Sequence, residues 1–115
     1  MHELSIAMSI VEMAEEEAVA RGNAQVHAVL LRLGLLSGIV KEALVSSYEM
    51  ACAGTLLGGS RLLIEDIPVE IFCPVCRCSR QIASIQRLCC PECGALASEV
   101  VKGRELELVA LELSE

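Results

Sequence analysis

Aromatic residues are scarce in this chain of 115 residues, which contains one Tyr, one Phe and no Trp. Because 54% of the residues are still hydrophobic, the core has to be built from Leu, Ile, Val, Ala and Met. Single-stranded nucleic acids are bound largely by stacking their bases on aromatic rings. The composition therefore argues against that class of partner. A chain of this length can bury one modest core.

Positive charge is also scarce, since nine Lys and Arg residues stand against sixteen Asp and Glu residues and give a net charge of −7. Phosphate backbones and anionic membranes attract clustered Lys and Arg, and this sequence has no such cluster. No window approaches the roughly 18 apolar residues of a membrane span, and no export signal is visible. We therefore expect no nucleic-acid partner, no membrane partner and a cytoplasmic location.

Histidine is the third scarce residue type, with only two in the whole chain, His2 and His27. A Ser-His-Asp triad is therefore disfavoured, and the sequence contains no phosphate-binding loop, dinucleotide fingerprint or zinc-protease motif. With no nucleophile and base in view, we do not expect an enzyme. His27 falls within a predicted strand, where a histidine at the surface or at the edge of the core is the ordinary case.

The periodicity of the apolar residues predicts two helices and three strands. The helices are expected over residues 3–21 and 41–53, and the strands over residues 25–35, 61–72 and 104–113. Gly22 and Gly54 end the helices, and Pro68 interrupts the second strand. The apolar face of the first helix is expected to comprise Leu4, Ala7, Met8, Val11, Ala14 and Ala18. The simplest architecture is an α+β fold with two helices on a three-stranded sheet.

A cysteine-rich insert precedes the last strand. Residues 73–101 hold six of the seven cysteines and two of the three prolines. The cytosol keeps thiols reduced, so these cysteines are better interpreted as metal ligands than as disulfides. We expect residues 73–101 to form a zinc-binding domain inserted into an α+β domain made of residues 1–72 plus 102–115.

Two Cys-x-x-Cys pairs give the insert the pattern of a zinc ribbon. Cys73 and Cys76 form one pair, Cys90 and Cys93 form the other, and thirteen residues separate them. Two such turns facing each other supply four sulfurs at about 2.3 Å to a tetrahedral ion. Cys89 competes with Cys90, but only Cys90 completes a Cys-Pro-x-Cys turn like the first. Four thiolates leave no open coordination position, so the expected Zn²⁺ is structural.

Other chemistries use the same residue types. An iron–sulfur cluster could take the same four ligands, and a redox-active Cys-x-x-Cys would need only one pair on a thioredoxin-like scaffold, which the predicted elements do not supply. Cys52, Cys78 and Cys89 are expected to be ordinary small residues and not ligands.

The first residues, MHELS, place a histidine beside the N-terminal amine and directly before the first predicted helix. The Met1 amine, the His2 imidazole and the adjacent backbone amides can close five- and six-membered chelate rings around one metal. Such a planar nitrogen set suits Ni²⁺ or Cu²⁺. On these two residues alone, a terminal histidine that binds nothing remains the alternative.

Five segments, MHELSIAMSIVEMAEEEA, LRLGLLSGIVKEALVSSYEMACAGT, LLIEDIPVEIFCPVC, CPECG and GRELEL, follow one another across essentially the whole chain. Together they resemble the HypA/HybF family of hydrogenase-maturation nickel metallochaperones. The resemblance implies a non-enzymatic carrier that binds Ni²⁺ through His2, the Met1 amine and nearby backbone amides, including that of Glu3. It also implies that the two Cys-x-x-Cys pairs hold Zn²⁺.

The resemblance implies partners as well. A HypB-type GTPase and the large subunit of a [NiFe]-hydrogenase are the expected ones, and a homodimer is left open. The alternative function is a zinc-ribbon adaptor or interaction module with no nickel role, in which the MHE start is incidental.

One segment departs from the family's pattern. Members commonly have an acidic residue and a proline where this chain has Val40 and Lys41. Where the family's acidic residue assists nickel, Val40 cannot. Glu42 still matches the pattern, but at the start of a helix it also suits the helix dipole.

Overall fold

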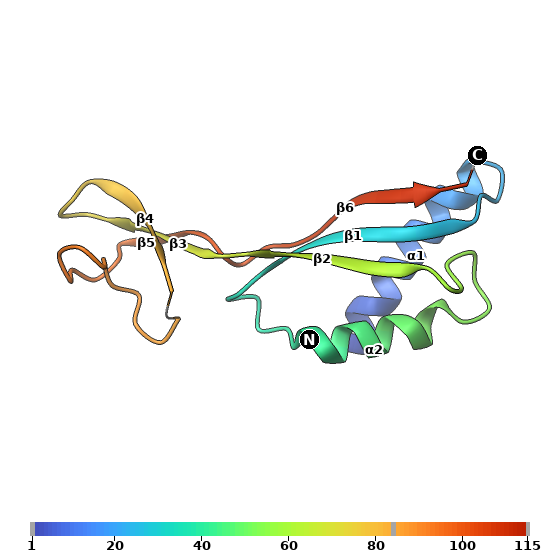
Figure 1. The fold of residues 1–115 in the computed structure, drawn as a ribbon, viewed down its shortest axis with the longest axis horizontal. Coiled ribbons are helices and arrows are strands. Elements are labelled where there is room, and N and C mark those ends of the chain that lie inside the picture. The colour runs from blue at the N-terminus through green and yellow to red at the C-terminus, as the bar shows by residue number, and fades with distance from the viewer. Residues whose placement is uncertain (1, 84, 115) are drawn as a thin grey trace. The chain divides into compact units, whose positions relative to one another are not determined.

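The computed structural model describes residues 2–83 and 85–114, shown in Figure 1. In chain order the elements are α1 (Glu3–Ala20), β1 (Val26–Gly34), α2 (Lys41–Cys52), β2 (Arg61–Ile67), β3 (Val69–Cys73), β4 (Cys78–Ile82), β5 (Glu99–Lys102) and β6 (Leu106–Leu113). The strands form two three-stranded sheets, with the orders β2-β1-β6 and β4-β3-β5. The predicted α+β fold of two helices on a three-stranded sheet is confirmed. None of the described helices is long and apolar enough to cross a membrane.

The chain divides into two compact units. The first comprises Met1–Leu31, Ile39–Ile64 and Leu108–Glu115, and the second comprises Arg32–Gly38 and Glu65–Glu107. The expected division of nickel and zinc binding between residues 1–72 plus 102–115 and residues 73–101 stays a prediction.

Helix α2 connects two parallel strands of the first sheet. The Val26 N–H donates to the Leu56 carbonyl at 3.0 Å and the Leu35 N–H to the Ile67 carbonyl at 3.2 Å, so β1 and β2 run in the same direction. Parallel neighbours need a crossover connection, and α2 provides it. Strand β6 lies on the other side of β1. Backbone hydrogen bonds join the end of β1 to the start of β6 and the start of β1 to the end of β6, so the two strands are antiparallel.

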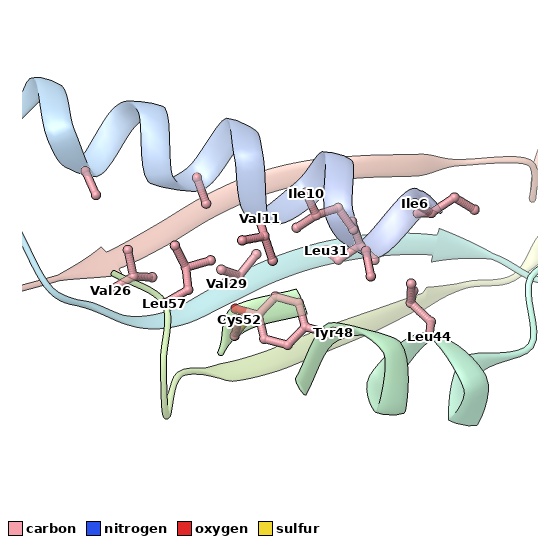
Figure 2. Close-up of a cluster of buried hydrophobic side chains, with 13 residues drawn as sticks. Ile6, Ile10, Val11, Val26, Val29, Leu31, Leu44, Tyr48, Cys52 and Leu57 are labelled. Carbon is pink, nitrogen blue, oxygen red and sulfur yellow. The ribbon is translucent and has the colours of Figure 1, made fainter. Parts of the chain in front are cut away.

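The core of the first unit lies where side chains of α1, α2 and β1 meet, as Figure 2 shows. Its buried residues are Ile6, Ala7, Ile10, Val11, Ala14, Ala18, Val26, Val29, Leu31, Leu44, Tyr48, Cys52 and Leu57. Tyr48 is the largest fully buried side chain among the described residues. Its hydroxyl lies 2.7 Å from the Ser60 hydroxyl, so the polar tip has a hydrogen-bond partner. Burial raises the pKa of Tyr48, which keeps the phenol neutral.

Two details of the expected core are wrong. Every methionine that the structure describes is more than half exposed, so none of them belongs to the core. In α1, Leu4 and Met8 are exposed, and Ile6 and Ile10 take their places on the buried face. Both sets of residues fit a period of 3.6, because they differ only by a rotation of the helix about its axis. The position of α1 over the sheet selects the isoleucines.

The predicted strand 61–72 is two strands in different sheets, which separate at Pro68 as the sequence indicated. Strand β3 pairs antiparallel with β4 on one side and β5 on the other. The buried core of this second sheet is small, and comprises Val69, Ile71 and Ile82. Strands β4 and β5 were not predicted, because five and four residues are too few to show a clear alternation.

Within the second unit, Gly34 and Gly103 bring two backbone segments into close approach. A Cβ atom added to Gly34 would lie 2.1 Å from the Gly103 carbonyl oxygen and 2.7 Å from the Arg104 nitrogen. Both are backbone atoms and cannot rotate away. Gly103 also has a φ of 125°, a conformation that other residues rarely adopt. This contact requires glycine at both positions.

We predict that Gly34→Ala lowers the free energy of unfolding by more than about 3 kcal/mol, because the methyl group forces the two segments apart. Gly58→Ala is the control, since its Cβ would sit at an ordinary 3.4 Å from the Thr55 carbonyl; it should change stability by less than about 1 kcal/mol. Urea unfolding of both zinc-loaded variants measures the difference. Equal stabilities would contradict the close approach.

Candidate metal centres

Four cysteine sulfurs converge in the second unit. Cys73 ends β3, Cys76 follows in the next turn, and Cys90 and Cys93 come from the segment between β4 and β5. All four Sγ atoms lie within 4.8 Å of one another, with 3.5 Å between Cys73 and Cys93 and 3.9 Å between Cys76 and Cys90. Ligands about 2.3 Å from a tetrahedral zinc ion are about 3.8 Å apart. The site therefore fits structural zinc.

The two cysteine turns have matching backbone geometry. The Arg77 N–H donates to the Cys73 carbonyl at 2.8 Å, and the Gly94 N–H donates to the Cys90 carbonyl at 2.9 Å. Both donor residues have a left-handed backbone conformation, with φ values of 58° at Arg77 and 77° at Gly94. Gly94 suits this conformation, whereas Arg77 is strained in it. Position 94 corresponds to position 77 of the first turn, and glycine adopts the left-handed conformation there without strain. This is one reason why the second turn begins at Cys90 and not at Cys89.

Backbone donors favour the thiolate at the first cysteine of each turn. At Cys73 the N–H of Cys76 lies 3.3 Å from Sγ and is the main cause of a lowered pKa. At Cys90 the N–H of Cys93 is the main cause, and the pKa falls to about 6. Metal ions bind the thiolate and not the thiol. The turns thus prepare both sulfurs for a metal ion.

Arg80 is part of this site, and the sequence analysis did not identify it as such. It lies on β4 opposite Ile71 of β3, and interaction with Cys76, and to a smaller extent with Cys90, raises the pKa of its guanidinium. Its Nε atom is buried and has no partner within the described part of the chain. Four thiolates around Zn²⁺ carry a formal charge of −2, which a guanidinium partly offsets. An arginine four residues after a Cys-x-x-Cys pair was the available signal.

The remaining cysteines lie outside the four-sulfur cluster. Cys52 belongs to the core of the first unit, Cys78 lies on β4, and Cys89 pairs with Leu96 in an isolated β-bridge. His27 is exposed on β1 and contacts the side chain of Ser114. Among the residues that can be described, no second group of His, Cys, Asp and Glu side chains converges as these four do.

The candidate nickel site lies at the start of α1. His2 is the N-cap residue, with extended backbone (φ −82°, ψ 146°), an exposed side chain and no capping hydrogen bond from it. The Glu3 carboxylate accepts a hydrogen bond from the Val40 N–H at 3.1 Å, and this bond is the main cause of a lowered pKa for Glu3. The start of α1 is thereby held to the start of α2. Met1 lies outside the described residues.

Of the sequence-predicted residues, the structure brings the four cysteines together and leaves His2 and Glu3 as neighbours at the start of α1. Val40 is exposed at the N-cap of α2, and its backbone, not its side chain, makes the contact with Glu3. Sequence reasoning missed this contact because 37 residues separate the two partners. Glu42 is exposed in the first turn of α2, as its place beside the helix dipole suggested.

We predict that Cys90→Ser weakens zinc binding at least about a hundredfold, because it replaces a thiolate ligand with a neutral hydroxyl. Cys89→Ser is the matched control and should retain one zinc per chain, since its sulfur is outside the cluster. Competition with a chromophoric chelator measures both affinities. Loss of zinc in Cys89→Ser with retention in Cys90→Ser would reverse the ligand assignment.

We predict that Arg80→Gln accelerates zinc release to a chelator and thiolate alkylation by iodoacetamide by about tenfold, because the sulfurs lose a neighbouring positive charge. Arg77→Gln removes an exposed charge from the same module and should leave both rates within about twofold. Stopped-flow release and mass spectrometry measure the rates. If the two substitutions had equal effects, the change in net charge would explain both, and the prediction for Arg80 would be wrong.

Comparison with known proteins gives a consistent assignment. Residues 1–113 match the family model described as "Hydrogenase/urease nickel incorporation, metallochaperone, hypA". The hydrogenase maturation factor HypA of Roseiflexus sp. (strain RS-1) is 48% identical over 97% of this chain and 91% of its own, and that of Chloroflexus aggregans is 45% identical over 97% and 98%.

Solved structures agree with these relatives. The solution structure of the Ni metallochaperone HypA from Helicobacter pylori matches with a TM-score of 0.64 and 27% identity, covering 98% of this chain and 97% of that one. A second HypA solution structure matches with a TM-score of 0.72 and 26% identity, covering 99% and 97%. With the four-cysteine site and the MHE start in place, these matches show that the chain belongs to the HypA family of nickel-incorporation metallochaperones.

Proposed function

We propose that this protein carries Ni²⁺ bound at its N-terminus and delivers it to the large subunit of a [NiFe]-hydrogenase. The main support for this proposal is that the His2 side chain is exposed at the helix cap. Its imidazole is exposed at the N-cap of α1 and makes no capping hydrogen bond, so it is available to a metal ion. Membership of a nickel-incorporation family supports nickel as the cargo.

The proposed ligands are the His2 imidazole, the Met1 amine and the adjacent backbone amides, including that of Glu3. The N–H groups of a helix's first turn have no intrahelical acceptor, so a metal ion that displaces their protons breaks no helical bond. Nitrogen donors in a plane suit Ni²⁺. An exposed site of this kind favours exchange of the ion with an acceptor, which is what a carrier needs.

The bond between the Glu3 carboxylate and the Val40 N–H supports this geometry. It holds the residue next to His2 against the start of α2, so the ligands project from a fixed helix end. In this chain a valine stands where family members commonly supply an acidic residue. We propose that Glu3 fixes the site through the Val40 backbone, with its carboxylate engaged there and not on nickel.

We propose that Cys73, Cys76, Cys90 and Cys93 bind Zn²⁺ and that this ion organises the second unit. The cluster geometry and the small apolar core of three residues support the proposal. Zinc binding contributes about 10–16 kcal/mol to the folding of small zinc modules at neutral pH. Four thiolates leave no position for substrate, which agrees with a carrier and not a catalyst.

We propose that a HypB-type GTPase and the hydrogenase large subunit are the partners of the carrier. Both follow from membership of the family, whose relatives are named hydrogenase maturation factors. Chain assembly as a monomer or homodimer is a separate property that the carrier function does not require.

The proposal predicts that His2→Ala abolishes nickel binding while zinc content and fold are retained. His27→Ala is the matched control, because it removes the other histidine of the chain from an exposed strand position. Calorimetry and absorbance, with nickel titrated into untagged, zinc-loaded protein, give the nickel affinity. Elemental analysis and circular dichroism give the zinc content and the fold.

Imidazole must be neutral to coordinate, so nickel should leave the wild type as the pH falls through the range in which imidazoles gain a proton. Nickel binding that survives in His2→Ala would place the site elsewhere, for example at the thiols. Loss of zinc in His2→Ala would contradict two separate metal sites.

A further inference from the structure

Strand β6 forms an unprotected edge of the first sheet. In the order β2-β1-β6 it has a neighbour on one side only, so its outer backbone groups have no strand partner within the described residues. It is eight residues long and contains no proline, and its central residues Leu108 to Leu111 carry no charge. Long, uncharged edges invite another strand, which proteins usually prevent with charges, proline or short length.

The opposite edge of the same sheet has that protection. Strand β2 carries three charged residues among its seven, Arg61, Glu65 and Asp66, and Pro68 follows immediately. Arg32 and Glu65 form an ion pair at 3.4 Å beside it. Strand β6 carries two charged residues among its eight, both near its ends, so its central backbone is the less protected of the two edges.

An open groove of about 650 Å³ runs along β6. Residues of β6 from Leu108 onward form one wall, and Glu17 and Arg21 at the end of α1 form the other. Leu108, Leu111 and Leu113 are only partly buried against the core, so the groove offers apolar surface beside the open backbone. An added strand would bury both together, as in β-strand addition.

Charge determines which occupant fits. Arg21 is the one basic side chain that lines the groove among the described residues, and Glu17 already pairs with it at 2.8 Å. Glu107 and Glu112 on β6 are exposed. If a second copy paired antiparallel along all eight residues, Glu107 would face Glu112 twice, and like charges directly opposite are destabilising. A strand that places a basic residue opposite Glu112 is favoured instead.

We propose that the β6 edge binds an extended segment of a partner protein, in which aliphatic and basic residues alternate, as an added antiparallel or parallel strand. The segment's backbone pairs with β6, its aliphatic side chains lie on the same face as Leu111 and Leu113, and its basic side chains lie on the opposite face, beside Glu112. The proposal does not depend on the nickel site at the other end of α1.

The test uses the full-length, zinc-loaded, nickel-free protein labelled with ¹⁵N and the probe peptide acetyl-Lys-Val-Lys-Val-Lys-Val-Lys-amide. We expect saturable binding, shifts centred on the amides of residues 108–114, and slowed hydrogen exchange at alternate β6 amides. The same peptide with every backbone nitrogen methylated keeps its charges but cannot pair, and it should not bind.

Glu112→Lys should weaken peptide binding by about threefold or more through reversal of one cross-strand charge pair. Glu49→Lys, an exposed substitution on α2 outside the groove, is the matched control and should leave binding unchanged. Equal binding of the methylated peptide, shifts away from β6, or equal effects of the two substitutions would overturn the proposal. Concentration-dependent dimerisation protecting the β6 amides would assign the edge to a second copy and overturn the proposed occupant. Nickel binding is unaffected in every case.

Discussion

Repulsion among four sulfurs is the constraint on which the second unit depends. Cys73, Cys76, Cys90 and Cys93 bring their Sγ atoms within 4.8 Å of one another, and several thiolates at that distance are stable only beside positive charge. A metal ion supplies most of it, and Arg80 supplies more from β4. The apolar core of this unit comprises only three buried residues, so the sulfur cluster has to hold the two cysteine turns together.

The first unit is stabilised in another way, and this suits a different task. Its aliphatic core, shown in Figure 2, fixes α1 and α2 over the sheet without any metal. The hydrogen bond from the Val40 N–H to Glu3 then fixes the first turn of α1, while His2 remains exposed just before it. A closed four-sulfur site keeps its ion, whereas an exposed N-terminal site can release one. The four-sulfur site suits structural zinc, and the nickel site that we propose at the N-terminus suits a transported ion.

Individual helices and strands could be predicted from the sequence, whereas the pairing and packing between them was harder to predict. Helix α2 and strand β1 end within a residue or two of the predicted bounds, because apolar period and glycine stops are local signals. Pro68 marked the change of sheet for the same reason. The buried face of α1 was mispredicted at Leu4 and Met8, since periodicity leaves the rotation of a helix undetermined until it packs. Strands β4 and β5 were missed because their pairing with β3, and not their own sequence, makes them strands.

The α+β class, the four cysteines that converge and the family can all be inferred from the sequence alone, because spacing and order along the chain are sufficient for each. Three features become visible only in the folded protein: the interaction of Arg80 with the cysteine cluster, the hydrogen bond from the Val40 N–H to Glu3, and the open edge of β6. Glu3 meets a residue 37 positions away, and the open edge depends on the order of strands that lie far apart in the chain. Arg80 is near its cysteines in sequence, but its direction is set by the pairing of β4 with β3. Such contacts depend on how elements pack, and the spacing of Arg80 from Cys76 is the one local signal for any of them.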